Sequence, residues 1–131
     1  MVDDDRDDRF LTQRAWNSLG IDNDCMEFSD GEAFLEYMAS DQGSQGRPRL
    51  VLLDLNMPRV DGWQVLDALK SSPETKAIPV VVLTTSRREA DVATSYRRGA
   101  AAFVSKPDTM NEWSQLMESI ADFWIESCTL P

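Results

Sequence analysis

Side chains suited to phosphoryl chemistry stand at widely separated places in this sequence. An acidic pair, Asp3 and Asp4, lies near the beginning, and Asp54, Thr84 and Lys106 follow at long intervals. Crowded carboxylates repel one another, which raises their pKa values or demands a cation. A hard divalent ion such as Mg²⁺ binds one or two carboxylates together with water and a phosphate oxygen. A metal ion and a lysine together neutralise the charge of a phosphoryl group that passes to a carboxylate.

The sequence contains no histidine and only two cysteines, Cys25 and Cys128. The lack of histidine excludes a Ser-His-Asp or Cys-His pair, removes the commonest metal ligand and means that the chain cannot be a phosphohistidine donor. The cysteines have neither a metal-type nor a redox-type spacing, so we expect two reduced thiols. Any chemistry must therefore use carboxylates, hydroxyls, lysine or a bound metal.

The composition indicates one acidic domain. A chain of 131 residues suits a single compact domain. Its net charge of −10 argues against nucleic acid or an anionic membrane as the main partner. The absence of a long apolar run predicts no transmembrane helix, and the acidic start is unlike an export signal, so we expect a cytoplasmic protein. The aspartates of residues 3–8 have an ordinary alternative explanation, a solvated face or a frayed terminus.

Short apolar runs alternate with helical patterns along the chain. Continuous apolar runs at residues 50–53 and 80–83, and a shorter run at 102–104, are typical of strands buried on both faces. Residues 25–28 form a weaker fourth run, and residues 1–2 are all that remains of a fifth. A central strand of two residues could not fill its place in a sheet, so we expect the first strand to be truncated at the N-terminus.

Five segments between these runs carry apolar residues at helical spacing. Their apolar faces are Phe10, Leu11, Ala15 and Leu19; Ala33, Phe34, Tyr37 and Met38; Val65, Leu66 and Leu69; Ala93 and Tyr96; and Trp113, Leu116, Met117, Ile120, Phe123 and Trp124. Gly20 is placed to end the first helix and Asp61 to cap the third. The helix at 89–98 has the thinnest apolar face and should be loosely held. Residues 40–48, rich in Gly, Ser and Gln, are predicted to form a loop.

The alternation of strands and helices predicts an α/β fold with a parallel sheet and helices on both faces. In such sheets, ligands bind at the carboxyl ends of the strands. The acid pair, Asp54, Thr84 and Lys106 each follow a predicted strand, so we expect them at one edge of the sheet. Taken singly, Thr84 is better explained as a strand-end cap and Lys106 as an exposed lysine. These ordinary explanations do not account for all of the residues falling at strand ends together.

Four motifs give the chain its resemblance to a known family. They are Val2-Asp3-Asp4; Leu52-Leu53-Asp54-Leu55-Asn56-Met57-Pro58 with Asp61-Gly62; Val82-Leu83-Thr84-Thr85-Ser86; and Phe103-Val104-Ser105-Lys106-Pro107. Together they are similar to the receiver domains of two-component response regulators, over the whole length of residues 1–131. The resemblance implies a flavodoxin-like, doubly wound sheet of five parallel strands in the order 2-1-3-4-5 with five helices. Residues 83–86, the long loop before Leu50 and the ending at 123–131 resemble stand-alone regulators paired with phytochrome-type sensor kinases.

The resemblance also implies roles at the acidic edge. Asp54 would accept a phosphoryl group from a sensor histidine kinase, and the domain would catalyse only its own phosphorylation and dephosphorylation. Asp4 would contact Mg²⁺ or Mn²⁺ directly and Asp3 through water, while Asp54 and the backbone carbonyl of Asn56 would complete the metal site.

The resemblance further implies a switch. Lys106 would pair with Asp54 or with the phosphoryl group, and Thr84 would move toward a phosphoryl oxygen. Phe103 occupies the aromatic switch position, where many relatives have Tyr. Because Phe lacks the hydroxyl, packing would have to hold its inward state.

Other functions compete with this one. An enzyme of the haloacid-dehalogenase type needs a second aspartate two residues after the nucleophile, but Asn56 stands there and cannot transfer a proton. A degenerate receiver that binds partners without phosphorylation, and a receiver cut from a longer chain with an output domain, are further alternatives. The ending in Leu130-Pro131 favours a stand-alone protein.

Phe123 and Trp124 extend the last helix, and an exposed apolar patch there would suit a protein contact. We therefore expect a homodimer through the last helix, with help from the fourth helix and the fifth strand. A role in the core alone is the alternative for these two residues.

Overall fold

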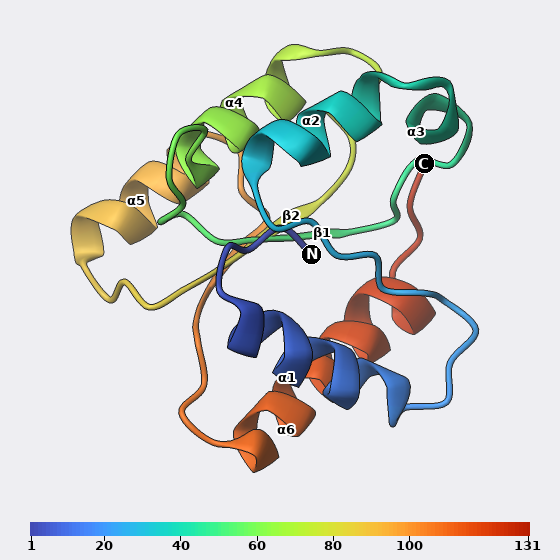
Figure 1. The fold of residues 1–131 in the computed structure, drawn as a ribbon, viewed down its shortest axis with the longest axis vertical. Helices are drawn as coiled ribbons and strands as arrows, with labels where there is room; N and C mark the ends of the chain where they lie inside the picture. Colours follow the sequence, from blue (N-terminus) through green and yellow to red (C-terminus); the bar gives the residue numbers. More distant parts are fainter.

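The computed structural model describes residues 1–131 and contains a parallel sheet of three strands. The strands are β1 (Val51–Leu53), β2 (Val80–Thr84) and β3 (Ala102–Ser105), in the order β1-β2-β3 (Figure 1). Strands β1 and β2 are entirely buried, as their continuous apolar runs predict. The third strand is half-exposed because it has a strand neighbour on one side only.

The expected five-stranded sheet is realised only in part. In place of the two predicted strands at residues 1–2 and 25–28, Val2 forms single parallel bridges to Phe28 and to Leu53. The Val2 amide donates to the Leu52 carbonyl at 2.8 Å, and the Phe28 amide donates to the Met1 carbonyl at 2.9 Å. The chain enters a helix at Arg6, so the pairing ends soon after Val2 on that side.

Six α-helices surround the sheet, where five were predicted. They are α1 (Arg6–Asn17), α2 (Gly31–Ala39), α3 (Asp41–Gln45), α4 (Gly62–Ser71), α5 (Glu89–Arg97) and α6 (Met110–Ile120), and α6 continues as a π-helical segment, η1 (Ala121–Ser127). The additional helix, α3, lies in the segment predicted to be a loop. It begins because the Ser40 hydroxyl caps it by accepting a hydrogen bond from the Gly43 amide at 3.2 Å.

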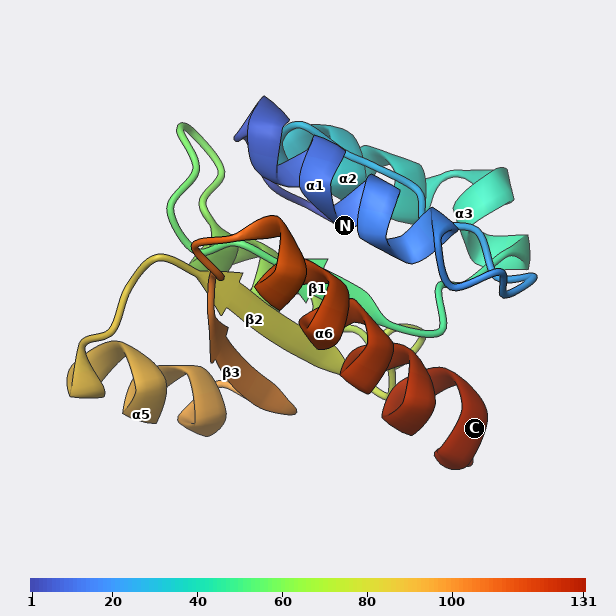
Figure 2. The ribbon, with the colours of Figure 1, turned by 90° about the horizontal axis from the view of Figure 1, so that it is seen from below.

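The helices form a layer on each face of the sheet, with α1 and α6 on one side and α2 and α4 on the other (Figure 1). Alternate residues of β2 separate the two halves of the core. Val80 and Val82 pack with α2 and α4, whereas Val81 and Leu83 pack with α1 and α6. Helix α5 lies beside the edge strand β3 (Figure 2). No helix in the structure has the length and apolar character needed to cross a bilayer.

Some predicted apolar faces were wrong. In α5 both Ala93 and Tyr96 are exposed, and the buried residue is Ser95. The helix therefore lacks the apolar face that was expected of it, although the Tyr96 hydroxyl accepts a hydrogen bond from the Phe103 amide at 3.2 Å. In α1 Phe10 points outward, because Thr12, Ala15 and Trp16 form the buried side.

Candidate functional site

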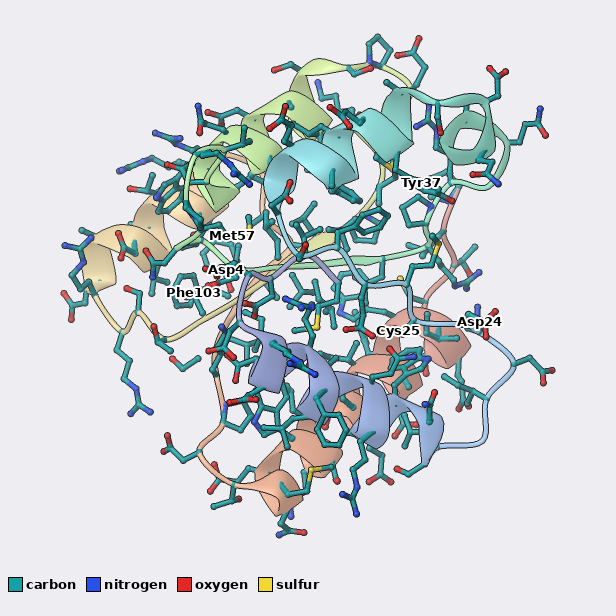
Figure 3. The ribbon with its side chains drawn as sticks, viewed as in Figure 1. Asp4, Asp24, Cys25, Tyr37, Met57 and Phe103 are labelled. Carbon is teal, nitrogen blue, oxygen red and sulfur yellow. The ribbon has the colours of Figure 1, made fainter.

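Backbone pairing brings the predicted site residues to one edge of the sheet. Because the strands are parallel, their carboxyl ends lie together, and Asp54, Thr84 and Lys106 stand at the ends of β1, β2 and β3. The Lys106 amide donates to the Thr84 carbonyl at 2.8 Å, and the Asp54 amide donates to the Val2 carbonyl at 3.0 Å. Asp4 lies at the same edge, where the chain passes from the sheet into α1 (Figure 3).

The Lys106 ammonium is the central cation of this edge. Its Nζ lies 2.7 Å from Asp8 Oδ2, 2.8 Å from Asp3 Oδ2 and 3.4 Å from Asp54 Oδ2, and its side chain is 7% exposed. Burial disfavours the charged form, but the ion pairs with Asp3 and Asp8 outweigh it and raise the pKa of Lys106 above its ordinary value. The lysine is therefore a fixed positive charge, not an exposed side chain in solvent.

Three carboxylates converge beside this lysine. Asp3, Asp4 and Asp54 each offer an oxygen, and these oxygens lie within 4.8 Å of one another. Asp3 and Asp54 are buried and Asp4 is exposed. Burial raises the pKa of Asp3 from 3.8 to about 6. Burial also raises the pKa of Asp54, although Lys106 opposes this.

The charge balance and the ligand atoms of the cluster fit a hard divalent cation. With Asp8, four carboxylates face a single ammonium, so the edge is electrostatically incomplete without a further positive charge. The available ligands are all oxygens, and one of the carboxylates is open to solvent, which leaves room for water or a phosphoryl oxygen.

Thr84 accepts hydrogen bonds from two different loops. Its Oγ1 receives the Asn56 side-chain amide and the Ser86 backbone amide, each at 3.4 Å. The Asn56 backbone amide also donates to Asp54 Oδ1 at 3.4 Å. The threonine side chain is completely buried, and its oxygen is the acceptor in both contacts, so the hydroxyl hydrogen remains available. It can therefore donate to a group bound on Asp54.

A glycine allows α4 to begin directly against the end of β1. A Cβ at Gly62 would lie only 2.2 Å from the Asp54 carbonyl oxygen. Just before it, Asp61 caps α4 as predicted, in a capping box with Gln64. Between β1 and α4, Arg59 has a φ of 62°, a left-handed conformation that is uncommon for residues other than glycine. The loop that follows Asp54 is thus held in a tightly defined shape.

Phe103, the predicted switch residue, lies on β3, the strand that Lys106 follows. Its ring is partly buried and packs against the half of the core formed with α2 and α4. Its backbone amide bonds to the Tyr96 hydroxyl at 3.2 Å, which ties the edge strand to α5.

Sequence reasoning missed Asp8. The sequence assigned roles to Asp3 and Asp4 and none to Asp8, yet Asp8 makes the shortest ion pair with Lys106. A possible signal was the place of Asp8 in the first turn of the predicted helix, just after the acid pair. The lysine partner, however, lies 98 positions away along the chain, and only the tertiary structure identifies it.

Comparison with known proteins agrees with this geometry. Residues 1–118 match the response regulator receiver domain. The chain is 38% identical to response regulator Rcp1 of Synechocystis sp., over 100% of this chain and 90% of the relative. The structure resembles the crystal structure of the Mn(2+)-bound form of response regulator Rcp1, with a TM-score of 0.89, 36% identity and coverage of 99% and 95% of the two chains. It also resembles the phosphorylated cyanobacterial phytochrome response regulator RcpA, with a TM-score of 0.91, 35% identity and coverage of 99% and 94%. This chain therefore belongs to the family of response regulator receiver domains.

Proposed function

We propose that this protein is a single-domain response regulator that receives a phosphoryl group on Asp54 from a sensor histidine kinase. The observation that carries the proposal is the buried Asp54 carboxylate, with Lys106 Nζ at 3.4 Å and the Asp3 and Asp4 carboxylates beside it. The phosphorylated form of RcpA and the Mn²⁺-bound form of Rcp1 support it by similarity.

The reaction is a phosphoryl transfer between nitrogen and oxygen. An Asp54 oxygen attacks the phosphorus of a phosphohistidine, a P–O bond forms, and the P–N bond breaks with its electron pair going to the imidazole of the kinase. Lys106 compensates the charge on the phosphoryl oxygens, and Thr84 donates a hydrogen bond to one of them. The domain catalyses only this reaction and the later hydrolysis of its own acyl phosphate.

A divalent ion, Mg²⁺ or Mn²⁺, fits the same edge. Asp3, Asp4, Asp54 and the backbone carbonyl of Asn56 would hold it, with Asp3 acting through water. When bound, such an ion neutralises phosphoryl charge and orients the group for in-line transfer. The excess of carboxylates over cations at this edge is the reason for the assignment.

Signalling then requires a changed protein surface. We propose that Thr84 moves toward the phosphoryl group and that Phe103 turns inward, which shifts α5. The lack of a buried apolar face on α5 favours this, because moving that helix sacrifices little packing. The relatives named above favour a phytochrome-type kinase as the partner.

We also propose the strand order of the family, 2-1-3-4-5, because Val2 forms bridges to Phe28 and to Leu53.

Assembly and partners are proposed from the surface. The exposed Phe123, which contacts Trp124 edge-to-face at 4.8 Å between ring centroids, favours a homodimer through the last helix, with α5 and β3. The net charge of −10 argues against nucleic acid and anionic membranes as partners and suits a cytoplasmic protein.

Intact mass after incubation with phosphoramidate and Mg²⁺ tests the assignment. The unaltered protein should gain one phosphoryl mass, which hydroxylamine removes because the product is an acyl phosphate. Asp54→Asn should gain none, whereas Asp24→Asn, on an exposed loop, should behave like the unaltered protein. A phosphoryl gain by Asp54→Asn at another residue would refute Asp54 as the acceptor. No gain by any of the proteins would favour the degenerate receiver.

A further inference from the structure

Asp8 makes a contact that the proposed reaction does not use. Its Oδ2 lies 2.7 Å from Lys106 Nζ, whereas Asp54 Oδ2 lies 3.4 Å from the same atom. The Asp8 side chain is 20% exposed and the lysine side chain is 7% exposed. Ion pairs that are removed from solvent in this way are screened far less than surface pairs.

The first turn of α1 fixes Asp8 in this position. The Asp5 carboxylate caps the helix by accepting the Asp7 and Asp8 amides at 2.9 and 3.1 Å. Two residues before the cap, the Asp3 carbonyl accepts a hydrogen bond from the Arg9 guanidinium at 2.8 Å. The Asp8 carboxylate is therefore presented to the lysine by a capped turn that is itself anchored to the sheet.

Lys106 has three N–H donors, and three carboxylates already surround it. A phosphoryl group on Asp54 adds negative charge and acceptor oxygens on the side where the present contact is longest. The lysine can direct its N–H groups to the phosphoryl oxygens only by lengthening its contact with Asp8 or with Asp3. Asp3 is buried and Asp8 is partly open to water, so Asp8 is the partner that solvent can most readily replace.

We propose that Asp8 is a positioning residue that holds the Lys106 ammonium away from Asp54 in the unphosphorylated protein. Asp8 thereby lowers the affinity of the site for a phosphoryl group. This inference rests on the proposed function of Asp54 and Lys106 and adds a residue that sets how strongly the two cooperate.

Beryllofluoride, a stand-in for the phosphoryl group on aspartate, provides the test at saturating Mg²⁺. Asp8→Asn should bind it roughly tenfold more tightly than the unaltered protein, because the lysine is released and one nearby negative charge is gone. Asp7→Asn is the matched control. It removes the same charge from the neighbouring residue, whose side chain makes no contact with Lys106, and should change the affinity less than about twofold.

A double-mutant cycle shows whether Asp8 acts through the lysine. In a Lys106→Met background, Asp8→Asn should tighten binding much less, because only the loss of the nearby negative charge remains. Urea unfolding of each variant checks that the fold is kept, and a structural role alone would not produce a gain that depends on Lys106.

The outcomes separate this inference from the proposed function. Equal affinities of Asp8→Asn and Asp7→Asn, weaker binding by Asp8→Asn, or an undiminished gain in the Lys106→Met background would each overturn the role of Asp8 alone. Failure of every protein to bind beryllofluoride would overturn both the role of Asp8 and the proposed function.

Discussion

Replacing Asp3 with Asn measures how much the buried acidic edge destabilises the folded protein. Asn has nearly the shape of a protonated aspartate but cannot ionise. Lys106 keeps Asp8 and Asp54 as partners in this variant, so the change removes one buried charge without isolating the lysine. The expected result is a more stable protein at neutral pH in the absence of divalent ions.

The size of the effect follows from the pKa of Asp3, which burial raises from 3.8 to about 6. Each pKa unit corresponds to about 1.4 kcal/mol, so the ionised carboxylate destabilises the folded state by about 3 kcal/mol at about pH 7.5. The folded state keeps the proton to a higher pH than the unfolded state does. The free energy of unfolding therefore falls as the pH rises through this window, and the penalty is only about 1 kcal/mol at about pH 4.5.

Urea unfolding of both proteins at the two pH values, with EDTA present, gives the measurement. The stability advantage of Asp3→Asn should shrink by about 2 kcal/mol on going from about pH 7.5 to about pH 4.5. Asp4→Asn is the control, because the Asp4 side chain is exposed and should give a small, nearly constant difference. Adding Mg²⁺ should stabilise the unaltered protein more than Asp3→Asn, since a ligand that binds only the folded state raises its stability.

An advantage of Asp3→Asn that is the same at both pH values would refute the reasoning. A loss of stability at neutral pH would refute it more strongly, because it would mean that the ion pair with Lys106 outweighs the burial of the carboxylate.

Three further predictions concern the loop, the switch and assembly. Gly62→Ala should lower the free energy of unfolding, measured by urea titration, by roughly 2 to 3 kcal/mol, because an added Cβ would lie 2.2 Å from a backbone oxygen. Gly46→Ala is the control. The atom nearest to an added Cβ there lies at 3.4 Å, so the free energy of unfolding should change by less than about 1 kcal/mol. Thr84→Ala should still be phosphorylated, but beryllofluoride should shift the amide NMR signals of Phe103 and of α5 much less than in the unaltered protein, and equal shifts in both would mean that the switch takes another path. Phe123→Ser should weaken a homodimer, as measured by sedimentation, and a monomeric unaltered protein at high concentration, with and without beryllofluoride, would contradict the dimer.

The sequence predicts the strands best where a run is apolar throughout. Residues 51–53 and 80–84 are buried on both faces, and such runs need a place between two layers of helices. The positions of Asp54, Thr84 and Lys106 follow directly, because each side chain comes at or just after the end of a strand. Their roles in catalysis remain predictions, whereas their convergence at one edge is a feature of the structure.

Features that depend on tertiary contacts could not be predicted in this way. Helix α3 forms in a segment of poor helix formers because Ser40 caps it and Gly43 packs against the backbone of Tyr37. The residues chosen for the apolar face of α5 are exposed, because that helix packs mainly beside the edge strand β3. Asp8 was missed for a similar reason, since a local run of acidic residues does not reveal which member faces a distant lysine.

The two hydrogen bonds that converge on the Thr84 hydroxyl link the loop between β1 and α4 with the loop between β2 and α5. One donor comes from Asn56, after β1, and the other from Ser86, after β2. The Ser86 hydroxyl in turn donates to Asp91 in α5 at 2.5 Å. Thr84 cannot move inward while both hydrogen bonds keep their lengths. A displacement of this one side chain must therefore also shift both loops and the start of α5. Exchange between the resting and displaced conformations should accordingly be concerted, with relaxation-dispersion NMR giving one common rate for the amides of Asn56, Ser86 and Asp91.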